Sequence, residues 1–124
     1  MTDRPLLQDA RILIVEDEIF IATALREYCL DAGAELAELS ATVEQSLELI
    51  ESMQFDLAVL DVEMPDGEVR PLAETLHNRG TRLLFHSGNS MPDELQAALP
   101  NAGFVMKPSP PDQLMDIIAS ALKS

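Results

Sequence analysis

Four short apolar runs that each lead into polar residues constrain the fold of this chain more than any other feature. Residues 12–15, 57–60, 83–86 and 104–106 lead into Glu16-Asp17, Asp61, Ser87 and Lys107, respectively. Buried strands of a parallel sheet read as nearly continuous apolar runs, and open α/β sheets bind ligands at the carboxyl ends of their strands. If the four runs are parallel neighbours, three carboxylates, one hydroxyl and one ammonium group meet at one small site. That set can hold a divalent cation and a phosphoryl group.

Helical patterns alternate with these runs at a short, regular spacing, which favours repeated βα units. The predicted strands cover 11–16, 35–39, 57–60, 82–86 and 103–106. The first predicted helix covers about 18–32, the second begins at Val43, the third runs from Val69 to Gly80, the fourth covers 92–99, and the fifth begins at Pro111. Residues 35–39 alternate polar with apolar side chains, which is typical of a half-exposed edge strand. We therefore expect an α/β fold, a doubly wound (βα)5 arrangement with sheet order 2-1-3-4-5.

Local patterns add detail to the helices and turns. The expected inward-facing residues are Ile21, Leu25 and Cys29 in the first helix, Val43, Leu47 and Ile50 in the second, and Leu114, Ile117, Ile118 and Ala121 in the last. Thr42 with Gln45 three residues later can form a capping box at the start of the second helix. The segment Pro65-Asp66-Gly67 predicts a turn.

Composition limits the class of protein. The chain of 124 residues has a formal net charge of −14. This charge disfavours binding to nucleic-acid phosphates, which needs clustered Lys and Arg. Solubility explains most of the acidity, and the functional interpretation is that it favours metal ions and basic partner surfaces. Because the N-terminus lacks signal-peptide features and no apolar stretch approaches membrane length, we expect a cytoplasmic protein. We expect one domain over 1–124, with its core at about 10–123 and no output domain.

The acidic residues at two strand ends suggest a metal site. Glu16 and Asp17 alone could simply favour the dipole of the following helix. Asp61 at the end of another strand changes this interpretation, because carboxylates brought together repel each other unless a cation lies between them. Mg²⁺ takes oxygen ligands. We expect Asp17 and Asp61 to bind Mg²⁺ (or Mn²⁺) directly and Glu16 to act through water.

Asp61 is also the candidate nucleophile, because a carboxylate can accept a phosphoryl group as an aspartyl phosphate. The transferred group carries spread negative charge, so cations and hydrogen-bond donors must surround its oxygens. Lys107 can pair with one oxygen and Ser87 can donate to another. Taken singly, these two residues would be read as a surface lysine and a loop serine; the combination points to phosphoryl transfer.

The chain resembles the receiver domains of two-component response regulators, the CheY-like superfamily. The resemblance lies in the ordered set of site residues Glu16-Asp17, Asp61, Ser87 and Lys107-Pro108. The segment 60–67, Leu-Asp-Val-Glu-Met-Pro-Asp-Gly, is similar to that family's phosphoacceptor signature. The resemblance extends from about residue 10 to the end of the sequence. It implies a flavodoxin-like fold, a reversible Mg²⁺-dependent aspartyl phosphate at Asp61, and an additional metal ligand from the backbone carbonyl of Glu63.

The resemblance also implies a conformational switch. In the family, phosphorylation pulls the hydroxyl residue inward and an aromatic residue on the last strand follows it; Ser87 and Phe104 take these positions. Serine lacks the methyl group of the commoner threonine, so we expect looser coupling. Phe104 is equally consistent with an ordinary core residue. Glu63, Gly88 and Asn89 flank the site, where they could position or exclude the attacking water.

The fourth predicted strand is similar to that of single-domain receivers with the so-called FAT GUY motif. Phe85 and Gly88 match that motif and Ser87 is a conservative match, whereas the later aromatic residue is absent. His86 stands where alanine is typical. We expect a partly exposed histidine at the strand end, and the alternative is a pH-sensing or supporting role beside the site.

The leading hypothesis is therefore a stand-alone response regulator that receives phosphate from a sensor histidine kinase or a histidine phosphotransfer protein. Its output would be phosphorylation-dependent contact with another protein, or it would serve as a phosphate sink or shuttle in a phosphorelay. It would catalyse only its own phosphorylation and dephosphorylation. We expect it to bind neither nucleic acid nor membrane, and to be a monomer or a phosphorylation-linked dimer.

Two other functional classes share part of this residue pattern. A small aspartyl-phosphate phosphatase or phosphotransferase acting on a diffusible substrate is the open alternative, because Glu63 lies two residues after Asp61, where such enzymes often carry a general acid. Against it, no inserted cap or substrate pocket is evident in so short a chain. An FMN carrier is rejected, because Glu16-Asp17-Glu18 stands where a Ser/Thr/Gly-rich phosphate loop would be needed.

Overall fold

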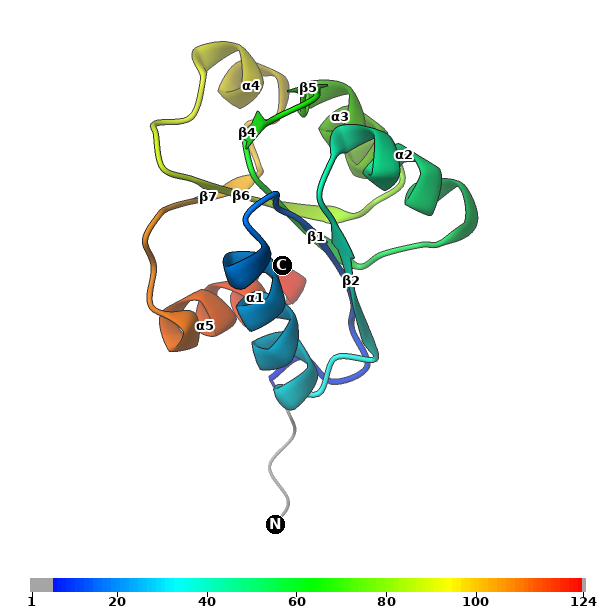
Figure 1. Ribbon diagram of the computed structural model, residues 1–124, viewed down its shortest axis with the longest axis vertical. Helices are drawn as coiled ribbons and strands as arrows, with labels where there is room; N and C mark the ends of the chain where they lie inside the picture. The colour runs from blue at the N-terminus through cyan, green and yellow to red at the C-terminus, as the bar shows by residue number, and fades with distance from the viewer. Residues whose placement is uncertain (1–5, 124) are drawn as a thin grey trace.

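A central parallel sheet organises the computed structural model, which describes residues 6–123 (Figure 1). Its five strands lie in the order β2-β1-β3-β6-β7, which confirms the predicted topology. The sheet strands are β1 (Arg11–Val15), β2 (Leu36–Ser40), β3 (Leu57–Leu60), β6 (Arg82–Ser87) and β7 (Gly103–Met106). The helices are α1 (Ile19–Asp31), α2 (Val43–Ser52), α3 (Arg70–Asn78), α4 (Asp93–Ala98) and α5 (Pro111–Leu122). Strands and helices thus alternate as expected of a flavodoxin-like fold.

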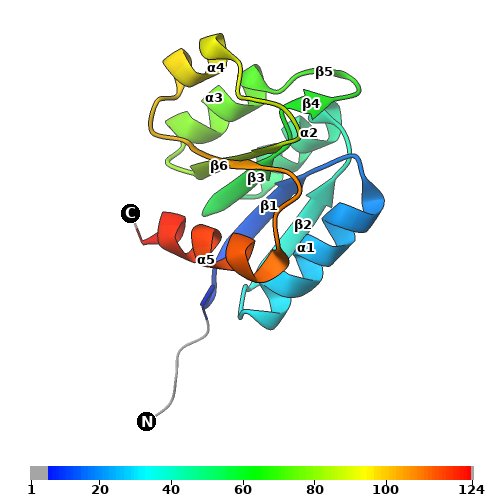
Figure 2. The same ribbon diagram turned by 90° about the vertical axis from the view of Figure 1, so that its left-hand side faces the viewer.

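Helices cover both faces of the sheet, α1 and α5 on one side and α2, α3 and α4 on the other (Figures 1 and 2). Each face has its own apolar core. The core under α1 and α5 includes Ile12, Ile14 and Ile118, and the core under the other three helices includes Leu13, Leu72 and Phe85. Successive residues of β1 thus alternate between the two cores, and Ile12 to Ile14 are fully buried. Two-sided burial explains why this strand reads as a continuous apolar run.

Helix α2 differs in detail from its predicted stripe. Leu47 is 39% exposed, whereas the polar Ser46 is fully buried. The Ser46 hydroxyl donates to the Thr42 carbonyl at 2.9 Å and lies 2.7 Å from the Ser40 hydroxyl at the end of β2. These bonds offset the cost of burying a polar group, so a serine can take the inward position expected of a leucine.

The start of α2 confirms the predicted cap in part. The Thr42 side chain accepts a hydrogen bond from the Gln45 amide at 3.0 Å. The Gln45 side chain returns to the amide of Ala41, one residue before the cap, and not to that of Thr42. A residue from another segment, Asp66, also caps this helix: its carboxylate oxygens accept from the amides of Val43 and Glu44 at 2.9 and 3.0 Å.

Asp66 belongs to a small hairpin that the sequence indicated only as a turn. Strands β4 (Glu63–Met64) and β5 (Gly67–Glu68) pair antiparallel directly after Asp61. Gly67 has φ +139°, a conformation that favours glycine and closes the turn. The hairpin follows β3 in the chain and leads to α3, and its Asp66 contacts the start of α2. In the described part of the chain, no helix is long and apolar enough to cross a membrane.

Candidate functional site

The carboxyl ends of four neighbouring strands bring the predicted site residues together. Glu16, Asp61, Ser87 and Lys107 lie at or directly after the ends of β1, β3, β6 and β7, which are adjacent in the sheet. Backbone bonds extend the sheet to these positions: the amide of Asp61 donates to the Val15 carbonyl at 2.9 Å, and the amide of Lys107 donates to the Ser87 carbonyl at 2.7 Å. The parallel register therefore fixes the site geometry through the backbone.

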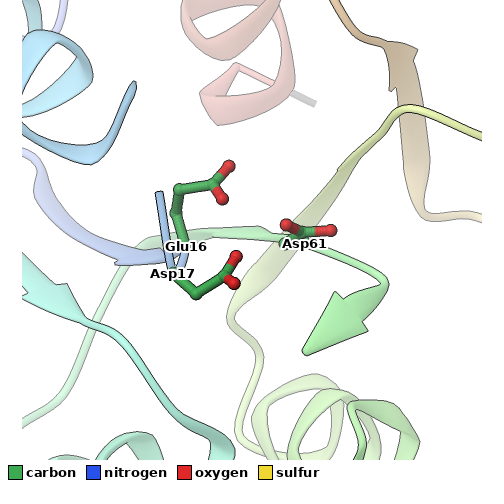
Figure 3. A group of neighbouring side chains, drawn as sticks. All are labelled: Glu16, Asp17 and Asp61. Atoms are coloured by element: carbon green, nitrogen blue, oxygen red, sulfur yellow. The ribbon is translucent and has the colours of Figure 1, made fainter. Parts of the chain in front are cut away.

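Three carboxylates face a common space at this edge of the sheet (Figure 3). One ligand oxygen from each of Glu16, Asp17 and Asp61 lies within 4.8 Å of the other two. Glu16 and Asp61 are buried, at 4% and 5% exposure, whereas Asp17 is exposed. The cluster is therefore held by the core on one side and open to solvent on the other.

The Lys107 ammonium group compensates part of this negative charge. Its Nζ lies 2.6 Å from Glu16 Oε1 and 3.0 Å from Asp61 Oδ2. Burial by itself would lower the pKa of Lys107, but its hydrogen bonds and ion pairs with Glu16 and Asp61 outweigh burial and raise that pKa. Lys107 therefore carries its positive charge at neutral pH.

The raised pKa of Glu16 indicates that one ammonium group does not fully balance the negative charge of the three carboxylates. Burial raises the pKa of Glu16 to about 7, and the nearby charge of Asp61 also raises it, against the lowering effects of Lys107 and the Glu18 amide. An oxygen-rich cluster with a carboxylate so hard to ionise fits a divalent cation, which would stabilise the charged forms. Mg²⁺ prefers oxygen donors of this kind.

Both oxygens of Asp61 have defined partners. Oδ1 accepts a hydrogen bond from the backbone amide of Glu63 at 2.9 Å, and Oδ2 accepts from Lys107. These two bonds, one from the following hairpin and one from across the sheet, orient the carboxylate in the site.

Ser87 is fully buried and belongs to a small polar network with the hairpin. Its hydroxyl lies 3.3 Å from Oε1 of Glu63, and the side-chain amide of Asn89 donates to the same oxygen at 2.6 Å. The backbone amide of Asn89 lies 3.2 Å from the Ser87 hydroxyl. Sequence analysis placed Glu63 and Asn89 beside the site but missed that they bind each other, because no local pattern links residues 26 positions apart.

Comparison with protein families decides the identity. Residues 12–119 match the family described as the response regulator receiver domain. The chain belongs to this family. Receiver domains are generally signalling modules, and this general role agrees with the leading hypothesis.

Solved structures of other receiver domains support this assignment. A CheY-like receiver domain protein from Methanospirillum hungatei JF-1 is 32% identical, with a TM-score of 0.81, and the match covers 92% of this chain and 94% of that one. The non-phosphorylated HemR receiver domain from Leptospira biflexa is 26% identical, with a TM-score of 0.81 and coverages of 93% and 95%. CheY4 of Vibrio cholerae, at 24% identity, TM-score 0.78 and coverages of 90% and 98%, shows the shared fold. No curated protein sequence matches this receiver chain.

The prediction of a partly exposed His86 is wrong. His86 is 4% exposed, because it lies within β6, pairs in register with Val105 of β7 and contacts Ser109 in the loop after Lys107. Its Nε2 lies 3.0 Å from the Ser109 hydroxyl, and its buried Nδ1 has no hydrogen-bond partner among the described residues. Burial lowers the pKa of His86, and the charge of Lys107 lowers it further, against the opposing effect of Asp61.

Phe104 lies where the receiver resemblance places the aromatic residue. It is partly buried, pairs in register with Phe85, and packs against the core under α2, α3 and α4. Its role as a switch stays a prediction, as does the likeness to the FAT GUY receivers.

Proposed function

We propose that this receiver accepts a phosphoryl group on Asp61 from the phosphohistidine of a sensor histidine kinase or a histidine phosphotransfer protein. The observation that carries the proposal is the position of the Asp61 carboxylate, which Lys107 and the Glu63 amide orient beside two further acids. The proposed output is phosphorylation-dependent contact with another protein.

In the proposed reaction, an oxygen of the Asp61 carboxylate attacks phosphorus. The bond between phosphorus and the imidazole nitrogen of the donor breaks, and its electron pair stays on that nitrogen. An acyl phosphate forms on Asp61. Lys107 pairs with one phosphoryl oxygen and Ser87 donates a hydrogen bond to another, which stabilises the charge on the transferred group.

Mg²⁺ or Mn²⁺ would be held by Asp17 and Asp61, with Glu16 acting through water and the Glu63 backbone carbonyl as a further ligand. When bound, the cation supplies charge stabilisation for the phosphoryl oxygens. The mixture of buried and exposed acids supports this role, because the cluster has oxygen donors and solvent access together.

The phosphatase alternative would use Glu63 as a general acid. Instead, one oxygen of the Glu63 carboxylate accepts from Asn89 and lies beside the Ser87 hydroxyl, as expected of a hydrogen-bond acceptor. This arrangement supports the receiver over an enzyme with multiple turnover.

The test is the intact mass of the protein after incubation with acetyl phosphate, with and without Mg²⁺. We expect one phosphoryl adduct that depends on Mg²⁺, is absent from Asp61→Asn, and persists in Asp116→Asn, a matched change at an exposed position of α5. If the wild type gives no adduct, a phosphorylated histidine phosphotransfer protein serves as the second donor. An adduct that survives in Asp61→Asn, or sustained hydrolysis of a small phosphate ester, would contradict the proposal.

A further inference from the structure

The loop that follows Lys107 has few means of holding its position. β7 ends at Met106, and the amide of Lys107 makes the last backbone bond of this strand to Ser87. Three of the next four residues are prolines, which have no backbone N–H to donate. The remaining residue is Ser109, and its hydroxyl is the one hydrogen-bonding side-chain group of the segment 108–111.

Packing also leaves this loop open on one side. A pocket of about 490 Å³ lies between the loop and α1, and its lining includes Phe20, Tyr28, Lys107, Pro108 and Ser109. Figure 2 shows the orange segment that leads into α5 on the same side of the sheet as α1. The pocket leaves the loop with fewer packing contacts on that side, so a specific bond there contributes more to its order.

His86 provides such a bond from the sheet. Successive side chains of a strand point to opposite faces, so His86 points away from the face to which Ser87 points. It contributes to the lining of the pocket, and its Nε2 lies 3.0 Å from the Ser109 hydroxyl. A buried neutral imidazole has one N–H donor and one bare acceptor nitrogen. The Nε2–H form uses the donor on Ser109 and leaves Nδ1, which has no described partner, as the bare acceptor.

The position of Lys107 affects the geometry of the site because its ammonium group is in close contact with two site carboxylates. It lies 2.6 Å from Glu16 and 3.0 Å from Asp61, and only 16% of its side chain is exposed. Misplacement of a reacting group by about 1 Å can cost a hundredfold in rate. A bond that holds the residue two positions after Lys107 therefore acts directly on the geometry of the site.

We propose that His86 is a positioning residue, which ties β6 to the loop after Lys107 through Ser109 and thereby holds the Lys107 ammonium group at Asp61. The expected effect of His86 on phosphorylation rests on the proposed function. The structural part of the inference, that the His86–Ser109 bond orders Lys107, stands independently.

The first test uses NMR to determine the tautomer of His86 and the rate at which the Lys107 ammonium protons exchange with water. The chain has two histidines and two lysines, so His77 and Lys123 are internal controls. We expect His86 to be the Nε2–H tautomer, and the Lys107 ammonium protons to exchange with water slowly. In Ser109→Ala, this exchange should accelerate about fivefold, the effect of losing one hydrogen bond, while Lys123 is unchanged. An Nδ1–H tautomer, or unchanged Lys107 exchange, would overturn the proposal.

The second test measures the initial rate of phosphorylation by acetyl phosphate with Mg²⁺. Ser109→Ala should react about fivefold more slowly than the wild type, and Ser109→Thr, which keeps the hydroxyl, should restore the rate. If Ser109→Ala is unfolded by circular dichroism, His86→Gln, whose amide can still reach Ser109, is compared with His86→Leu instead. Equal rates in a folded pair would overturn the proposal. If the wild type accepts no phosphoryl group from any donor, the proposed function fails and the NMR test alone decides the inference.

Discussion

The Ser87 hydroxyl lies 3.3 Å from a carboxylate oxygen of Glu63, the residue two positions after Asp61. A serine hydroxyl has one proton to donate. If Ser87 is to donate to a phosphoryl group on Asp61, it must leave Glu63. Under the proposed function, the contact belongs to the unphosphorylated protein, and Glu63 competes with a phosphoryl oxygen for the Ser87 proton.

Replacing Glu63 by glutamine should accelerate phosphorylation by acetyl phosphate about fivefold, because it removes a negative charge that repels the anionic donor and weakens the hold on Ser87. The rate is measured by intact mass against time. Glu68→Gln is the matched control, since Glu68 is exposed and pairs with Glu63 across the hairpin. A rate equal to or below that of the wild type would show that Glu63 does not compete for Ser87.

Replacing Asp17 by asparagine should weaken Mg²⁺ binding by at least about tenfold, because one charged ligand is lost from the cluster. Isothermal titration calorimetry measures the affinity directly. Asp116→Asn makes the same change at an exposed position far from the cluster in sequence and should bind as the wild type does. Equal affinity in both variants would place the cation elsewhere.

Stability should depend on His86 below neutral pH. Because burial lowers its pKa from 6.5, the unfolded chain binds a proton where the folded chain does not. The contribution is fully present above pH 6.5 and declines as the pH falls from there toward the folded pKa. Glu16, whose pKa burial raises to about 7, titrates in the same range with the opposite effect on stability, and it does so in every variant compared. From about pH 7.5 to about pH 5.5, the free energy of unfolding should therefore change more favourably for His86→Gln than for the wild type, as measured by urea unfolding followed by far-UV circular dichroism. His77→Gln is the control at the other histidine, and an equal change in His86→Gln and the wild type would show that His86 does not cause the pH dependence.

Asp66 should stabilise the start of α2 from the neighbouring hairpin. Its two bonds to the Val43 and Glu44 amides lower its pKa, so the stabilisation is present above the ordinary pKa of 3.8 and lost as pH falls through the lower folded value. We expect Asp66→Ala to have a lower melting temperature than Asp66→Asn, which keeps one acceptor oxygen. Glu68→Ala on the same hairpin serves as the control. Identical melting curves for the two Asp66 variants would show that these bonds contribute nothing.

The sequence by itself determined the order of the five sheet strands and the five helices, the edge position of β2, and the set of residues at the carboxyl ends of the sheet strands. It could do so because each depends on short-range properties: apolar runs, helical periodicity, and the rule that parallel strand ends lie at one edge. Glu16, Asp17 and Asp61 gather as expected because their positions follow from the strands that precede them.

Only the tertiary structure decided which side chains bind each other across the site. The burial of His86 depends on β7 and the loop after Lys107, and the contact of Glu63 with Asn89 depends on a hairpin that the sequence indicated only as a turn. Ser46 took an inward position because Ser40 and Thr42 supply its hydrogen bonds. These outcomes depend on contacts between segments distant in the chain, whose distances are set by packing and register and not by any local pattern of residues.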